Sequence, residues 1–171
     1  MTPATAADIE TVSRQLGRPA RDVVGIAARC ACGNPTVVST KPRLADGTPF
    51  PTFYYLTHPA ATSAVSTLEA EGEMPGFAAL LVDDVALAYR AAHESYIADR
   101  EAHGVVDEIA GISAGGMPDR VKCLHALVGH ALAAGPGVNP IGDLALERAA
   151  WSPEVCECTV VVGPPDSGGG A

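Results

Sequence analysis

Apolar residues in the first part of the chain recur at helical spacing. Over residues 5–16 they form a thin stripe along one face of a helix. Thr5 is a typical residue at the start of a helix, and Gly17 is typical of a helix end. The pattern therefore predicts a first helix over residues 5–16.

The next stretch changes to short runs of β-branched and aromatic residues. The runs cover residues 23–28, 36–40 and 51–57, and turn-forming residues at 33–35 and 46–47 separate them. Connections this short cannot carry a parallel crossover, so neighbouring strands must run antiparallel. We expect a small antiparallel sheet of about three strands near the N-terminus.

From His58 onward the pattern is helical again, and four further helices are predicted, the last of them short. They cover residues 59–71, 83–103, 119–134 and 143–151. The order of one helix, then strands, then helices indicates an α+β fold, in which the sheet packs against three to four helices.

The domain organisation follows from where these patterns end. Residues 1–151 form a single α+β domain in this interpretation. Residues 152–171 end in PPDSGGGA and are predicted to be a disordered C-terminal tail.

Composition and charge narrow the class of protein. Hydrophobic residues make up 47% of the 171 residues, which is enough for a core and excludes global disorder. Twenty acidic against eleven basic residues give a net charge of −9, which argues against a general nucleic-acid binder but leaves room for a local basic pocket. The sequence has neither a membrane-spanning apolar run nor a secretory signal, so we expect a cytoplasmic protein with no membrane partner.

Five cysteines are the main candidates for chemistry: Cys30, Cys32, Cys123, Cys156 and Cys158. An odd number in a cytoplasmic chain fits a disulfide framework poorly. The alternatives are buried thiols, metal ligands or a reactive thiol.

The sequence around the first cysteine pair resembles half of a zinc knuckle. Cys30 and Cys32 precede a glycine in a turn, although their C-x-C spacing is looser than the usual C-x-x-C. The second half of the site has four candidates in the chain: Cys123, His58, His130, or the pair Cys156 and Cys158.

The predicted metal site uses zinc, with an iron–sulfur cluster less expected. Its ligands are Cys30, His58 and Cys123, with His130 or Cys32 as the fourth. Cys156 and Cys158 are interpreted as an unused, exposed pair near the tail. A set of small buried thiols without metal stays open as the alternative.

Helical geometry constrains the role of Cys123. On a regular helix over 119–134, Cys123 and His130 share a face, whereas His125 points about 200° away from Cys123. A C-x-H pair on such a helix cannot close on one ion. A further alternative is thiol catalysis, with Cys123 as nucleophile and a nearby histidine as base.

An anion site is predicted at the start of the helix expected over residues 119–134. Gly115 and Gly116 precede the predicted helix start, whose free N–H groups attract anions, and Arg120 and Lys122 add positive charge. The ligand would be a phosphate or carboxylate. If a metal kept a water ligand, the same cations would hold an anionic substrate for hydrolysis, whereas four protein ligands would make the site structural. The alternative is an ordinary helix start with solvated Arg120 and Lys122.

Four long segments resemble a known bacterial family. They are QLGRPARDVVGIAARCACGNP, LADGTPFPTFYYLTHP, YRAAHESYIADREAHGV and SAGGMPDRVKCLHALVGHALAAGPGVNPIGD. Together they identify the chain, over residues 15–143, as similar to domain-of-unknown-function family five hundred and one, which is mainly actinobacterial. The resemblance implies no established activity.

The resemblance has some implications for site residues. Members commonly match this chain at six positions, which are Cys30, Gly33, Pro35, Cys123, His125 and His130. Relatives often carry cysteine in place of His58, which favours His58 as a metal ligand.

Gene neighbourhoods give the second functional hypothesis. Genes of the family lie near cell-division and polyphosphate-hydrolase genes. By association, this implies a metal-free protein-interaction module in cell division or envelope regulation, whose acidic surface contacts a basic protein partner. Enzymatic activity stays undecided between these hypotheses.

Overall fold

The structure is a computed structural model of the chain, and it describes residues 1–158. A four-stranded antiparallel sheet has the order β1-β2-β3-β4. Its strands are β1 (Thr2–Pro3), β2 (Val23–Arg29), β3 (Pro35–Thr40) and β4 (Tyr54–Leu56). The α+β prediction is confirmed. The extra strand, β1, has two residues and pairs Thr2 with Ile26, so it is too short to leave a pattern in the sequence.

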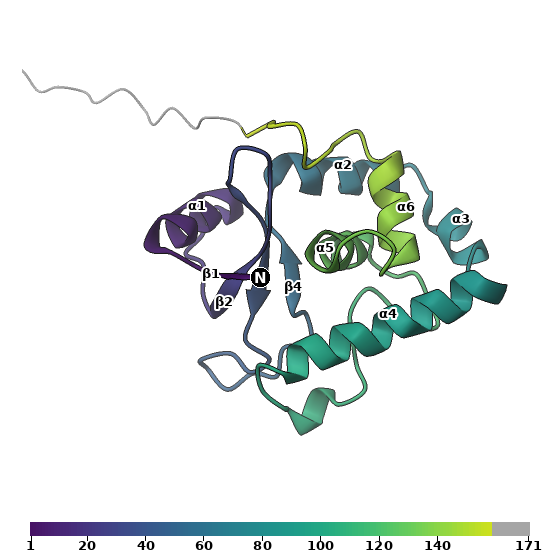
Figure 1. Ribbon diagram of the computed structural model, residues 1–171, viewed down its shortest axis with the longest axis horizontal. Coiled ribbons are helices and arrows are strands. Elements are labelled where there is room, and N and C mark those ends of the chain that lie inside the picture. Colours follow the sequence, from purple (N-terminus) through teal and green to yellow (C-terminus); the bar gives the residue numbers. More distant parts are fainter. Residues whose placement is uncertain (159–171) are drawn as a thin grey trace, which may run out of the picture.

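Helices lie on both sides of this sheet (Figure 1). They are α1 (Ala6–Leu16), α2 (Pro59–Ala70), α3 (Met74–Ala79), α4 (Asp83–Glu101), α5 (Leu124–Ala134) and α6 (Pro140–Arg148), with a short 3-10 helix at Asp107–Ile109. In Figure 1, α1 lies on one side of the sheet, and α5 lies on the other side with α2, α4 and α6 around it. None of the helices within residues 1–158 is long and apolar enough to cross a bilayer.

The first helix begins and ends where its sequence predicts. Thr5 accepts a hydrogen bond from the Asp8 backbone N–H, and the Asp8 side chain accepts one from the Thr5 backbone N–H. Gly17 ends the helix in the left-handed conformation, with φ of 66°. This capping box satisfies backbone groups that a helix end otherwise leaves unpaired.

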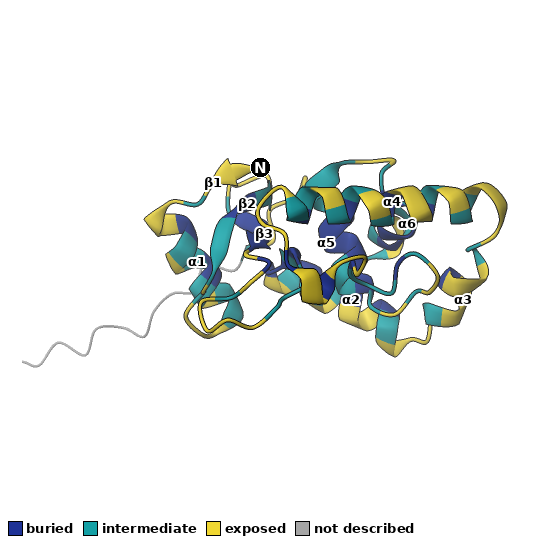
Figure 2. Cartoon of the chain, turned by 90° about the horizontal axis from the view of Figure 1, so that it is seen from below, coloured by how far each residue is buried: buried dark blue, intermediate teal, exposed yellow. Residues whose placement is uncertain are grey.

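Two apolar clusters hold the layers together. The small cluster lies between α1 and the sheet around Val12, Ile26 and Val38. The large cluster lies on the other side, where α5 is the most buried helix (Figure 2). Every residue of β3 is buried because both faces of the sheet are covered. The helix that carries His130, α5, has six buried residues, which are Leu124, Leu127, Val128, Gly129, His130 and Ala131.

That helix begins five residues later than the sequence predicts, at Leu124 instead of Asp119. Residues 115–123 form a hydrogen-bonded loop, in which the Arg120 N–H donates to the Gly116 carbonyl and the Lys122 N–H donates to the Gly115 carbonyl. Gly115 and Gly116 both have positive φ, which favours this loop over a helix. The helix therefore begins at Leu124 and not beside the two glycines, so the prediction of a helix start at this place is wrong.

The last helix and the segment after it also differ from the predictions. The helix α6 covers Pro140–Arg148 instead of residues 143–151, and Asn139 caps it, because its side chain accepts from the Gly142 N–H at 2.9 Å. After Trp151 the chain returns to the turn between β2 and β3, where the Ala31 N–H donates to the Pro153 carbonyl at 2.8 Å. Of the predicted tail, residues 159–171 lie outside the described residues.

Candidate metal centre and thiol site

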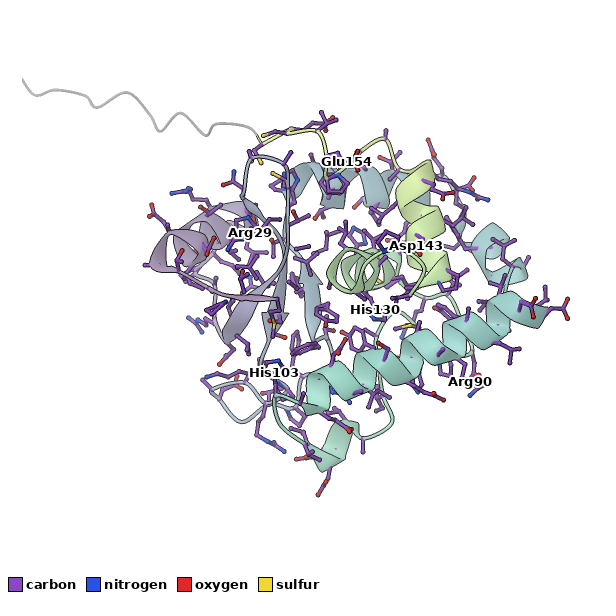
Figure 3. All side chains as sticks on the ribbon, viewed as in Figure 1. Arg29, Arg90, His103, His130, Asp143 and Glu154 are labelled. Carbon is purple, nitrogen blue, oxygen red and sulfur yellow. The ribbon has the colours of Figure 1, made fainter. Side chains whose placement is uncertain are left out.

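Four cysteines from opposite ends of the chain meet at the turn between β2 and β3. We call Cys30, Cys32, Cys156 and Cys158 the cysteine cluster, because their four Sγ atoms all lie within 4.8 Å of one another. Figure 3 shows sulfur atoms gathered where the segment after α6 passes this turn. All four are free thiols, and such a cluster can hold a metal ion.

The sulfur–sulfur distances are short for thiols without a shared partner. Cys158 Sγ lies 3.5 Å from Cys30 Sγ and 3.4 Å from Cys32 Sγ, and the latter two lie 2.8 Å apart. Two thiolates on one tetrahedral zinc lie about 3.8 Å apart, given a Zn–S bond of about 2.3 Å. The two distances to Cys158 are close to this zinc spacing, whereas Cys30 and Cys32 would have to move apart by about 1 Å to share an ion.

Hydrogen bonds in the turn favour a thiolate at Cys32. Contacts from the Cys30 thiol and the Asn34 backbone N–H lower the pKa of Cys32 to about 6. Burial raises the pKa of Cys30, and burial likewise raises the pKa of Cys158 to about 12 although the Asn34 side chain donates to it. Burial thus disfavours the thiolate forms of Cys30 and Cys158. A metal ion at the cluster would offset this penalty, because it replaces the thiol protons.

His58, a predicted ligand, lies beside the cluster as the N-cap of α2. Its Nδ1 accepts the Ala61 N–H at 3.4 Å, so its Nε2 carries the proton in the neutral ring. Burial lowers its pKa and keeps the ring neutral. That Nε2 lies 3.2 Å from Cys158 Sγ, and the geometry makes it a hydrogen-bond donor to this sulfur.

The structure does not bring the other predicted ligands to the cluster. Cys123 lies at the start of α5 in a separate group with Glu69 and His125. His130 lies in the core between α5 and α4 (Figure 3), where its ring stacks on Tyr54. The Asn139 side chain donates to its Nδ1 at 3.2 Å. Conversely, Cys156 and Cys158, interpreted from the sequence as an unused pair, complete the cluster.

His130 gives a testable pH dependence of stability. Burial lowers its pKa from 6.5 to about 4. Between these values the unfolded chain binds a proton that the folded chain does not, so stability falls as the pH falls. We expect a loss of about 3 kcal/mol from pH 7 to pH 4 from this residue.

Urea denaturation across that pH range measures the effect. The variant His130→Phe removes the titrating ring and keeps an aromatic side chain against Tyr54. Its stability should change less with pH than that of the wild type. Equal slopes in the two proteins would show that His130 does not titrate as its burial indicates.

A second group of chemical interest lies at the start of α5. Cys123 is the N-cap residue, with φ of −150° and ψ of 110°, instead of lying within the helix. At this position the Sγ of Cys123 lies within 4.8 Å of a ring nitrogen of His125 and of a carboxylate oxygen of Glu69. The expectation that these two side chains diverge is wrong, because it assumed a regular helix through both.

The residues of the predicted anion site line a cavity beside this thiol. The cavity has a volume of about 680 Å³, and its lining includes Gly115, Gly116, Arg120, Lys122 and Cys123. Although no helix begins at the glycines, the loop gathers these groups around one space. The two glycines and two cations of residues 115–122 indicate these groups in the sequence. The proximity of Cys123 to His125 could not be predicted, because the helix was expected to begin at Asp119.

Comparison with known proteins places the chain in a family without assigning it an activity. A family model described as "Protein of unknown function (DUF501)" matches residues 26–147, which include Cys30, Cys32 and Cys123 and exclude Cys156 and Cys158. No protein of curated function and no solved structure matches the chain. The match covers most of the sequence, and the protein belongs to the DUF501 family.

Proposed function

We propose that the protein binds one zinc ion through Cys30, Cys32, Cys156 and Cys158. The observation that carries the proposal is the convergence of four Sγ atoms within 4.8 Å from two distant segments. Four thiolates in a tetrahedral arrangement are typical of structural zinc sites, which leave no position open for water. The bound ion therefore would hold the segment after α6 against the turn between β2 and β3.

Donors around the cluster support a thiolate site. The backbone N–H of Asn34 faces Cys32, and the Asn34 side chain and His58 Nε2 face Cys158. A ligating His58 would need its lone pair on Nε2, which would place a proton on Nδ1 against the Ala61 N–H. In this proposal His58 offsets the negative charge of the four sulfurs as a donor. A reducing cytoplasm would keep the thiols available for the metal.

Metal analysis of purified protein tests the proposal. The protein is prepared without affinity metal or chelator, and zinc is measured by mass spectrometry. We expect about one zinc per chain in the wild type and in Cys123→Ser, and loss of zinc in Cys32→Ser and Cys158→Ser. Removal of the ion should lower the melting temperature of the wild type, because the metal binds only the folded cluster.

Two further variants separate the ligand sets. Cys156→Ser should lose zinc, whereas His58→Asn should keep it, because asparagine can still cap α2. If Cys156→Ser kept zinc and His58→Asn lost it, the fourth ligand would be His58 instead of Cys156. Unchanged zinc in Cys32→Ser and Cys158→Ser would overturn the proposal, and a brown absorbance would replace zinc with an iron–sulfur cluster.

A further inference from the structure

The group at the start of α5 lies at the other end of α2 from the cysteine cluster. Thr62, Ser66 and Glu69 share one face of α2, and this face meets Cys123 and His125. His58, beside the cluster, begins the same helix, about 16 Å from Glu69 by the rise of an α-helix. The two groups are therefore separate sites.

The protonation of His125 follows from its partners. Its Nε2 lies 3.2 Å from the Thr62 carbonyl, which can only accept, so Nε2 carries a proton. Its Nδ1 lies 3.3 Å from Glu69 Oε1, which favours a second proton there. Both nitrogens thus face acceptors, which favours the protonated ring, and this ring beside Cys123 favours the thiolate form of that residue.

Cys123 has the surroundings of a reactive cysteine, which are a helix N-terminus, a neighbouring histidine and an adjoining cavity. It is the N-cap residue of α5, where the helix dipole favours negative charge. The His125 contact lowers the pKa of Cys123, and the Cys123 contact raises the pKa of His125. The thiol is half-buried and lines the cavity, so small molecules can reach it.

The charges that face this thiol are mixed, with two unpaired cations. Glu69 comes from α2, and Asp119, Arg120 and Lys122 come from the loop before α5. Among residues 1–158, no carboxylate lies within 4 Å of Arg120 or Lys122, whereas Asp119 pairs with Arg90. Two free cations beside a thiol, in a chain of net charge −9, favour a negatively charged substrate.

We infer that Cys123 and His125 form a second, catalytic site that transfers acyl groups from anionic esters or amides. The Cys123 thiolate attacks the acyl carbon, the bond to the leaving group breaks, and His125 gives its Nδ1 proton to the leaving group. Water then adds to the thioester carbon as His125 takes its proton. The C–S bond breaks, which releases the acid and restores the thiolate.

Alkylation of Cys123 tests the nucleophile without relying on the cysteine cluster. Trypsin cleavage gives peptide 123–148, in which Cys123 is the one cysteine, so its modification is read directly by mass spectrometry. At pH 6.5, native Cys123 should react with iodoacetamide at least about tenfold faster than the same residue in urea-unfolded protein. His125→Gln should remove most of this advantage. A native rate equal to or below the unfolded rate overturns the inference without any variant.

The charge of the reagent tests the anion pocket. The rate with iodoacetate relative to iodoacetamide should fall several-fold in the double variant Arg120→Gln/Lys122→Gln, whose two side chains are exposed. In this variant, which lacks the cleavage site at Lys122, the modification is read on peptide 101–148, where Cys123 is again the one cysteine. Arg14→Gln, an exposed change on α1, is the matched control and should leave the ratio unchanged. An unchanged ratio in the double variant overturns the anionic substrate.

Acyl transfer has its own readout. With the 4-nitrophenyl monoester of succinic acid, the wild type should release nitrophenol and carry a succinyl group on peptide 123–148, and Cys123→Ser should do neither. Absence of acylation overturns the proposed reaction. A second zinc per chain that blocks alkylation, and that Glu69→Gln and His125→Gln both lose, overturns it in favour of a metal site on Glu69, Cys123 and His125.

Discussion

Replacing Gly142 with alanine is expected to destabilise the protein by about 3 kcal/mol. A Cβ at this position would lie 2.3 Å from the Leu127 carbonyl oxygen and 2.8 Å from Ala131 Cβ. Both atoms belong to α5, whose backbone cannot move away because the helix is buried between β4 and α6. Alanine normally favours a helix over glycine by about 1 kcal/mol, so here the clash must outweigh a gain.

The control for this prediction is Gly76→Ala in α3. A Cβ at Gly76 would meet no atom within 4 Å, so the helix preference should act alone. Urea denaturation should place the midpoint of Gly142→Ala well below that of the wild type, and Gly76→Ala at or above it. If both variants shifted alike, α6 would not pack on α5 as closely as the structure shows.

The elements that the sequence predicts well are those whose signals are local. The first helix has its N-cap, its glycine end and its apolar stripe within residues 5–17. The strands 23–29 and 35–40 combine β-branched residues with a turn between them. Neither β1 nor α3 could be predicted, because two and six residues are too few for a periodic pattern.

The start of α5 at Leu124 differs from the predicted start for a physical reason. Pro118 and Asp119 have the composition of a helix start, but the carbonyls of Gly115 and Gly116 accept hydrogen bonds from residues 120 and 122 and close a loop. This error displaced Cys123 from the N-cap into the helix and separated it from His125. The wrong helix start is thus the reason why the group of Cys123 and His125 could not be predicted from the sequence.

The cysteine cluster could be half predicted. Cys30 and Cys32 stand in a turn with glycine, which is the local signature of a metal knuckle. Their partners, Cys156 and Cys158, come from a segment more than a hundred residues away, as the 128-residue separation of Cys30 and Cys158 shows. Only the packing of that segment on the turn, through Ala31 and Pro153, joins the halves, and no spacing rule encodes it.

Replacing Arg100 with methionine is the other change with a large expected effect, a loss of about 3 kcal/mol. Arg100 is 1% exposed, and its guanidinium donates to the carbonyls of Pro51, Ile109 and Ile112. Within residues 1–158 it pairs with no carboxylate. Methionine replaces the volume of the side chain, but the backbone carbonyls cannot be removed and would stay buried without donors.

Two variants on α4 make the test specific. Arg90→Met changes an exposed arginine, with 58% of its side chain accessible, and should cost less than about 0.5 kcal/mol. Arg100→Lys keeps the charge but has fewer donors in a different geometry, so its stability should lie between those of the wild type and Arg100→Met. Equal stability of Arg100→Met and the wild type, measured by urea denaturation, would show that water or other groups satisfy these carbonyls.

The same variants connect the core to the thiol site. Arg100 binds the carbonyls of Ile109 and Ile112, and the loop that these residues begin continues to Gly115 and Gly116 beside Cys123. Loss of the guanidinium should loosen this loop even where the protein stays folded. We therefore expect Arg100→Met to weaken the preference of Cys123 for an anionic reagent, although Arg100 lines no part of the cavity.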